Sequence, residues 1–284
     1  MKKLLLAALL GFSVSLTAQE TVLPAKAQTD PIYIINAIIH TGNGTVIEKG
    51  TIRIEAGKIV AVGDNIPVPR SANIQVVDAA GKHVYPGLIL PTSALGLVEI
   101  SAVRATQDAR EIGDMNPSIR SIVAYNTDSK VINTLKSNGI THANIVPEGA
   151  TISGTSSVVQ LDAWNWEDAA YATDNGVHLN MPALFNRPNR FAAFLGTQGP
   201  QVDPIKRGLE QIEEIKSFFR EANAYLTQTQ HSNVNLKFES IKGLYTKKQK
   251  LFIHCDVVRE ILAAIDFKNE FDFESCPIKS FFLL

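Results

Sequence analysis

The stretch Lys82-His83-Val84-Tyr85-Pro86-Gly87-Leu88-Ile89-Leu90-Pro91-Thr92-Ser93-Ala94-Leu95-Gly96-Leu97 decides the fold. Its β-rich beginning is broken by Pro86-Gly87, and the apolar run Leu88-Ile89-Leu90 follows the break. That run has the length and residue types of a fully buried strand. We therefore expect one small strand-built unit to end at this point and a second unit to begin.

The residues before this junction have the pattern of β-strands. Apolar and charged residues alternate in Thr51–Glu55, which indicates a strand with one face in water. Ala56-Gly57 then turns the chain into Lys58–Gly63, so the two runs form a hairpin. Further strands are predicted at Ile32–Ile39, Ile74–Asp78 and His83–Tyr85. Together they predict a small β-sandwich.

After the junction, strand patterns alternate with helix patterns, which is typical of a parallel sheet or barrel. Asp128–Ser137 has helical character, and Ile140–Val146 is the next strand. A second buried strand is predicted at Leu251–Ile253, with Asp256 as N-cap of the helix that follows. Two apolar stripes at helical spacing are predicted to be buried: Leu209, Ile212, Ile215, Phe219, Ala222 and Leu226, and then Val257, Val258, Ile261, Leu262 and Ile265.

The junction and the order of strands before it resemble the amidohydrolase superfamily, in particular its imidazolonepropionase-like and dipeptidase-like members. The resemblance covers most of residues 31 to 273. It implies an α/β protein with an N-terminal β-sandwich at residues 28–87, followed at residues 88–284 by a partial, unclosed (β/α)8 barrel of the TIM type. The family would continue beyond Phe273 with three more strand-helix units, so we expect about five units here.

The resemblance also implies a divalent metal, Zn²⁺ or another ion. In the family, a His-x-His pair at the end of the first barrel strand holds this metal, and a histidine ends the fifth strand. The positions that match the pair are Thr92 and Ala94. The neutral hydroxyl of Thr92 is a poor metal ligand beside imidazole, and the methyl group of Ala94 has no lone pair. The position that matches the fifth strand is His254, which is the predicted metal ligand. No catalytic residue is assigned.

Two functions from different classes follow. The resemblance implies that the parent family hydrolyses C–N bonds of dipeptides, other amides or cyclic amides by metal-activated water. Without the His-x-His pair, the activity of this chain is in question. The alternative is a non-catalytic secreted protein, a pseudoenzyme, that binds a small molecule through the loops around Gly154 and Trp164–Trp166. Metal analysis of the folded protein separates the two.

Several other residues have side chains or backbone groups that can bind ions or small molecules. The carboxylates Glu99, Asp108, Glu111 and Asp114 fit a solvated loop better than a cation site. The loop at residues 147–157 fits an ordinary tight loop better than an anion-binding nest. His178 is a further candidate site residue. Four other side chains are expected to be structural or at the surface: His40, His83, Cys255 and Cys276.

The net charge and the N-terminal residues indicate what the protein binds and where it is located. Lys and Arg number 27 against 28 Asp and Glu, so no net field favours nucleic acid, and a small-molecule partner is expected. Met1-Lys2-Lys3 and the short apolar run after it match a secretory signal peptide within residues 1–27. We expect a secreted or periplasmic protein without a membrane span after cleavage.

Overall fold

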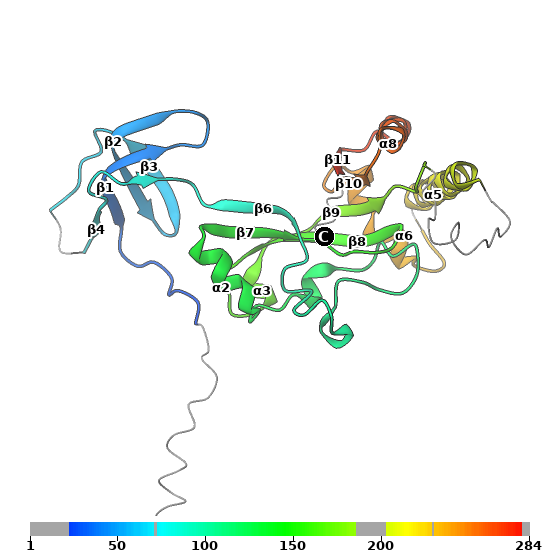
Figure 1. Cartoon of the computed structure of the whole chain (residues 1–284), viewed down its shortest axis with the longest axis horizontal. Coiled ribbons are helices and arrows are strands. Elements are labelled where there is room, and N and C mark those ends of the chain that lie inside the picture. The colour runs from blue at the N-terminus through cyan, green and yellow to red at the C-terminus, as the bar shows by residue number, and fades with distance from the viewer. Residues whose placement is uncertain (1–22, 71–72, 186–202, 229, 280–284) are drawn as a thin grey trace, which may run out of the picture. The chain divides into compact units, whose positions relative to one another are not determined.

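The computed structural model describes residues 23–70, 73–185, 203–228 and 230–279. They form a mixed α/β structure in two compact units, each with its own sheet (Figure 1). The first unit is Met1–Pro86 with Asp162–Trp164, and the second is Gly87–Leu161 with Asn165–Leu284. Most of the predicted signal peptide lies outside the described residues. Among the described helices, none is long and apolar enough to cross a membrane.

The first unit contains one mixed sheet of five strands. Strand β1 is central, with β2 antiparallel on one side and β4 and β5 parallel to it on the other. The expected hairpin is present between β2 and β3, and its turn residues Ala56 and Gly57 have positive φ. Where a sandwich was predicted, the described residues of this unit supply a single sheet. Its strands are β1 (Ile32–His40), β2 (Val46–Glu55), β3 (Lys58–Gly63), β4 (Gln75–Asp78) and β5 (His83–Val84).

The second unit contains a curled sheet in the order β11-β10-β9-β8-β7-β6 (Figure 1). All neighbouring pairs are parallel except those of β8, which runs antiparallel to both β7 and β9. The sheet has its ends at β6 and β11 in the part of the chain that is described. Its strands are β6 (Leu88–Ser93), β7 (Ile140–Ile145), β8 (Ile152–Gln160), β9 (Ala170–Asn180), β10 (Lys250–Cys255) and β11 (Ser275–Lys279).

Strand β8 corrects two expectations. Residues 147–157 were predicted to be one loop, but β8 begins at Ile152. The predicted barrel would have parallel strands throughout, whereas the connection from Ile145 to Ile152 is too short for the crossover of a dozen or more residues that a parallel neighbour needs. The chain therefore turns back on itself at this point, and β7, β8 and β9 form a meander.

Helices surround this sheet. The predicted helix near Asp128–Ser137 is observed as α2, and the strongest amphipathic stripe lies on the long helix α5. Asp203 caps α5 because its carboxylate accepts a hydrogen bond from the Ile205 backbone N–H. The helical elements are η2 (Arg104–Thr106), η3 (Ser121–Ala124), α2 (Lys130–Ser137), α3 (Trp166–Ala169), α5 (Pro204–Leu226), α6 (Leu236–Ser240), α7 (Lys242–Tyr245) and α8 (Val258–Phe271).

The main core lies between β9, β10 and the helices α5 to α8. Phe219 of α5 is fully buried and its ring contacts those of Phe267, Phe271 and Phe273 at centroid distances of 5.2 to 5.7 Å. Burial of such large apolar side chains is the main favourable term in folding. The strand residues that complete this core are Val177, Leu179, Leu251 and Ile253.

Three predictions about burial are wrong. Leu209, which belongs to the stripe predicted to be buried on α5, is 53% exposed. Leu88 and Ile89 are 61% and 62% exposed, because β6 ends the described sheet and has a strand neighbour on one side only. On α8, the predicted stripe faces outward, with Val258 and Leu262 exposed. The buried face of α8 instead consists of Glu260, Ala264 and Phe267.

The helix α8 also begins one residue later than expected. Val257 rather than Asp256 is the N-cap residue. The buried carboxylate of Glu260 accepts hydrogen bonds from the backbone N–H groups of Asp256 and Val257, at 2.8 and 3.3 Å. It also accepts one from the N–H of Leu184 at 3.2 Å. Glu260 is thus buried because it supplies the acceptors that the helix start requires.

The Phe219 core gives a prediction about stability. Phe219→Ala is expected to lower the free energy of unfolding by about 3–5 kcal/mol, because it removes a fully buried ring and leaves a cavity. Leu262→Ala is the matched control, since Leu262 is 56% exposed and its truncation is expected to cost less than about 1 kcal/mol. Urea unfolding followed by circular dichroism measures both. Equal losses in the two variants would contradict this description of the core.

Candidate functional site

The carboxyl ends of β6, β7, β9 and β10 lie at the same edge of the curled sheet. This follows from the pairing, because β6 is parallel to β7, β9 is parallel to β10, and the reversed β8 gives β7 and β9 the same direction. Functional loops of α/β folds gather at this edge. Thr92 and His254 are both near the ends of their strands, so they share this edge of the sheet.

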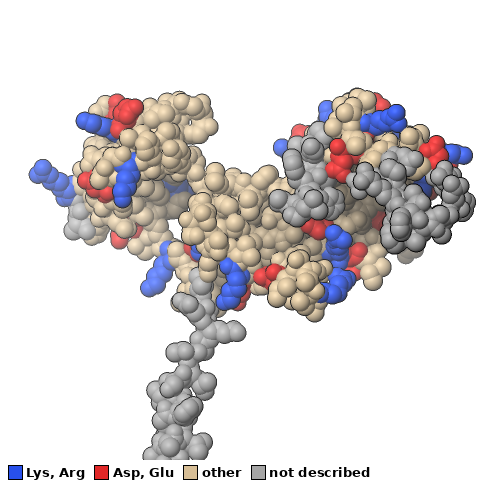
Figure 2. All heavy atoms as spheres, in the orientation of Figure 1, with Lys and Arg blue, Asp and Glu red and all other residues tan. Residues whose placement is uncertain are grey.

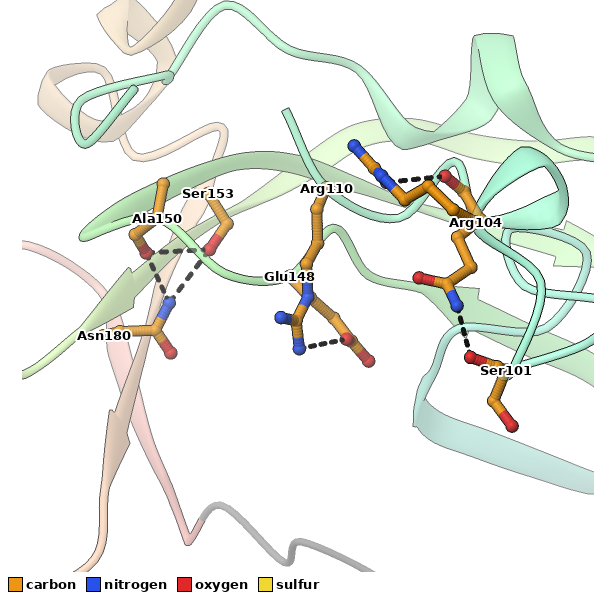
Figure 3. Close-up of polar contacts among 8 residues, drawn as sticks. Ser101, Arg104, Arg110, Glu148, Ala150, Ser153 and Asn180 are labelled. Carbon is orange, nitrogen blue, oxygen red and sulfur yellow. Dashed lines mark hydrogen bonds and ion pairs between the residues drawn. The ribbon is translucent and has the colours of Figure 1, made fainter. Parts of the chain in front are cut away.

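Asn180, the last residue of β9, forms hydrogen bonds with the connection between β7 and β8 at this edge. Its side-chain amide donates to the Ala150 carbonyl at 2.7 Å and to the Ser153 hydroxyl at 2.9 Å (Figure 3). Its backbone N–H donates to the Thr151 carbonyl at 2.8 Å. These bonds fix the connection between β7 and β8 against the end of β9. Asn180 is not predicted from the sequence as a site residue, although its place at the end of a strand is a usable signal.

A second polar group involves the long loop after β6. Arg110 of this loop forms an ion pair with Glu148 at 3.4 Å, on the connection between β7 and β8 (Figure 3). The Glu148 backbone N–H donates to the Ala109 carbonyl at 2.7 Å. Within the loop, Arg104 donates to the Gln107 carbonyl at 3.4 Å, and Gln107 donates to the Ser101 carbonyl. The two loops therefore form one surface at the strand ends.

His254 and His178 form a pair on neighbouring strands. Nε2 of His254 lies 2.9 Å from Nδ1 of His178, and the rings are 5.2 Å apart. The His254 ring is partly exposed, while His178 is fully buried and stacks on Phe252 at 4.9 Å. Nε2 of His178 has no hydrogen-bond partner among the described residues. The pairing engages one nitrogen of His254, so its role as a metal ligand stays a prediction.

Burial sets the charge of this pair. It lowers the pKa of His178 to about 3, with a smaller contribution from the positive charge of His254. Burial also lowers the pKa of His254, against the opposing effect of Asp256. Both imidazoles are therefore neutral at pH 7, and one N–H donates to the other ring.

A catalytic zinc does not fit these residues. Such a site uses about three protein ligands. The His178–His254 pair offers at most two imidazoles, which is one ligand too few, and Thr92 and Ala94 stand where further imidazoles would be needed. In the parts of the chain that the structure describes, no group of three or more His, Cys, Asp or Glu side chains is placed to hold a metal ion.

A cleft lies beside the strand ends. Its volume is about 270 Å³, and it runs between α5 and the loop that carries Asp114. Thr151 borders the cleft and joins it to Asn180 through the backbone hydrogen bond described above. The wall consists of three carboxylates, two amide or hydroxyl groups and three apolar side chains: Asp114, Glu214, Glu221, Gln211, Thr151, Met115, Ile215 and Phe218.

Of the other residues that the sequence offers as candidates, some have structural roles and one lines the cleft. Glu99 accepts hydrogen bonds from Asn126 and Ser129, at 3.0 and 2.9 Å, so it holds the loop in place. Asp114 alone of the four loop carboxylates lines the cleft. Gly154 lies in β8 with φ +133, and a Cβ there would be 2.5 Å from the Ile119 carbonyl oxygen, so it is required by close packing.

The buried His178 predicts a pH dependence of stability. In the unfolded chain its pKa returns to about 6.5, so the unfolded state binds a proton that the folded state excludes. Stability is therefore complete above pH 6.5 and falls as the pH drops toward 3. Between pH 7 and 5, the free energy of unfolding is expected to fall about 1–2 kcal/mol more in wild type than in His178→Phe.

Urea unfolding at the two pH values measures this difference. Phe252→Leu is the control, because it removes the ring that stacks on His178 and keeps the titrating group. It is expected to retain the wild-type dependence. If His178→Phe retains it as well, the buried neutral histidine is the wrong explanation.

The chain was compared with protein-family models, with known sequences and with solved structures. No family model matches the chain. The chain is 24% identical over 294 aligned positions to amidohydrolase tasK of Hapsidospora irregularis, and the match covers 88% of this chain and 29% of tasK. The crystal structure of an amidohydrolase from Thermotoga maritima MSB8 superposes with a TM-score of 0.71 at 22% identity, over 87% of this chain and 63% of that one.

The chain thus spans less than two thirds of either relative's length. At this level of identity the structural match shows the fold. The sequence match independently involves a protein named as an amidohydrolase. The resemblance of this chain to the amidohydrolase superfamily, expected from its Pro-Gly junction, is therefore confirmed.

Proposed function

We propose that this chain is an amidohydrolase-like module that binds a small molecule at the carboxyl ends of its sheet strands, without a catalytic metal on the described residues. The observation that carries the proposal is the cleft between α5 and the loop after β6. Ligand sites in such folds lie at this edge of the sheet. The volume of about 270 Å³ suits a small ligand.

The lining of the cleft indicates the chemical class of the ligand. Asp114, Glu214 and Glu221 contribute carboxylates, and none of the lining residues is basic. Met115, Ile215 and Phe218 contribute apolar surface next to them. A molecule with an ammonium group and a short apolar or aromatic part therefore matches the cleft, since the carboxylates attract the cation and the ring of Phe218 can pack on the apolar part.

The metal-free part of the proposal rests on the two histidines. His254 is the residue that the family resemblance assigns to a metal, and the imidazole beside it is that of His178, so the pair supplies at most two ligands. Thr92 and Ala94 provide no imidazole at the strand end where the family has two. A metal-activated water lacks the ligands it requires, so we derive no hydrolytic step from these residues.

Hydrolysis of C–N bonds in dipeptides, amides or cyclic amides is the second candidate. The likeness to proteins named as amidohydrolases favours it. Relatives of this kind typically use a divalent metal, such as Zn²⁺. Export to a periplasmic or extracellular space also remains a proposal, based on the basic and apolar residues that begin the chain.

Ligand binding is tested with three probes of similar size: phenethylamine, neutral phenethyl alcohol and anionic phenylacetate. Calorimetry is expected to detect binding of the amine and no binding of phenylacetate. Asp114→Asn and Glu214→Gln are each expected to raise the dissociation constant for the amine about two- to fivefold, because each removes one exposed carboxylate from the cleft. Glu210→Gln is the control, since Glu210 is exposed on α5 outside the lining. Equal binding of the three probes would refute the cleft as a cation site.

Hydrolysis is tested separately on a panel of dipeptides and cyclic amides with added Zn²⁺. We expect no turnover above buffer, and we expect wild type and His254→Gln to contain the same amount of zinc per chain after dialysis. Zinc-dependent turnover that His254→Gln abolishes would overturn the metal-free proposal and favour the second candidate. His254→Ala is also expected to cost less than about 2 kcal/mol of stability, because the ring is partly exposed.

A further inference from the structure

The first unit contains an array of three rings that the proposed function does not use. His40 ends β1 and His83 begins β5, and these two strands pair in parallel, with Ile38 opposite His83. Nε2 of His40 lies 2.9 Å from Nδ1 of His83. The ring of Tyr85 stacks on His40 with centroids 4.2 Å apart and planes inclined by 11°. The sheet therefore holds two imidazoles side by side.

This pair is accessible from solvent. His83 is exposed, His40 is partly exposed, and Tyr85 is 63% exposed. The pairing of β1 with β5 fixes the backbone positions of both histidines, and the stack with Tyr85 restrains the His40 ring. Two ligands held in this way lose little freedom when they bind a common ion, so the second bond forms at a high effective concentration.

The separation of the two nitrogens suits a shared transition metal. With metal–nitrogen bonds of about 2.0–2.1 Å, two ligands at right angles on one ion have nitrogens about 2.9 Å apart. The observed separation is 2.9 Å. In the hydrogen bond, the two nitrogens point at each other, so the His83 ring must turn outward to make room for an ion in front of the His40 Nε2 lone pair. The exposed His83 ring faces solvent and is the one with room to turn.

Binding of a metal to both histidines neither releases nor takes up a proton overall. A neutral imidazole carries one N–H, and the bond between the rings uses a proton on either His40 Nε2 or His83 Nδ1. Binding a metal through both atoms requires that this proton move to the other nitrogen of the same ring. Each histidine then remains neutral, and no net proton is released.

We propose that His40 and His83 form a two-histidine site for a divalent transition metal, with Cu²⁺ bound more tightly than Ni²⁺ or Zn²⁺. The order follows from the general preference of nitrogen sites for Cu²⁺ among first-row ions. Right-angled ligands also match the square-planar geometry of Cu²⁺ and Ni²⁺ better than the tetrahedral geometry of Zn²⁺. Water completes the coordination. This site belongs to the first unit and is independent of His254.

The test uses the full chain and Cu²⁺ alone as the probe. Calorimetry is expected to show one tight Cu²⁺ per chain, and electron paramagnetic resonance is expected to show hyperfine coupling to two nitrogens. His40→Gln and His83→Gln are each expected to weaken binding about tenfold or more, because each leaves a single imidazole. Tyr85→Phe is expected to bind as wild type, since it keeps the stacked ring.

His254→Gln and His142→Gln are the controls for histidines of the second unit. Both are expected to leave the two-nitrogen signal unchanged. The proposal is overturned if His40→Gln and His83→Gln bind Cu²⁺ as wild type does, or if the signal disappears in His254→Gln instead. A third measurement needs no variant: Cu²⁺ is expected to protect His40 and His83 from modification by diethyl pyrocarbonate, mapped by mass spectrometry, and an absence of protection refutes the site.

Discussion

Packing of the helices α5 and α8 against β9 and β10 is the interaction on which the second unit depends. Phe219 and Phe267 fill the space between the two helices and the strands, and both are fully buried. This packing holds β10 in place, and β10 presents His254 at the strand ends. The same position of α5 gives the cleft one of its walls. The core and the candidate site are therefore built on the same two helices.

The helix α5 could be predicted from its residues, and α8 only in part. On α5 the apolar residues recur at one spacing among many charges, so only one face can be buried, and Ile212, Ile215 and Phe219 are indeed buried. On α8 apolar residues occur on two faces. Pattern alone could not show that Phe267 and Ala264 would face the sheet while Ile261 and Leu262 would face outward, because that choice depends on which neighbours are present.

The sequence could predict that the candidate site lies at the ends of strands, but it could not predict which side chains contact each other there. A histidine at the end of a buried strand indicated His254, whereas the connection after β7, which borders the cleft at Thr151, is predicted from the sequence as an ordinary loop. The bond between His178 and His254 joins residues 76 positions apart, and the pair in the first unit joins residues 43 positions apart. Such distant pairs depend on strand register, which a single sequence does not reveal. Mixed charges over the face shown in Figure 2 agree with the balanced composition.

The reversed strand β8 bears on the order in which the sheet can assemble. β7, β8 and β9 follow one another closely along the chain, so pairing them closes only short loops and costs little chain entropy. β10 pairs with β9 only after the long stretch that contains α5 has been brought back, which is a slower, non-local step. The meander is thus suited to form early and to present β9 as the template on which the histidine-bearing strand later docks.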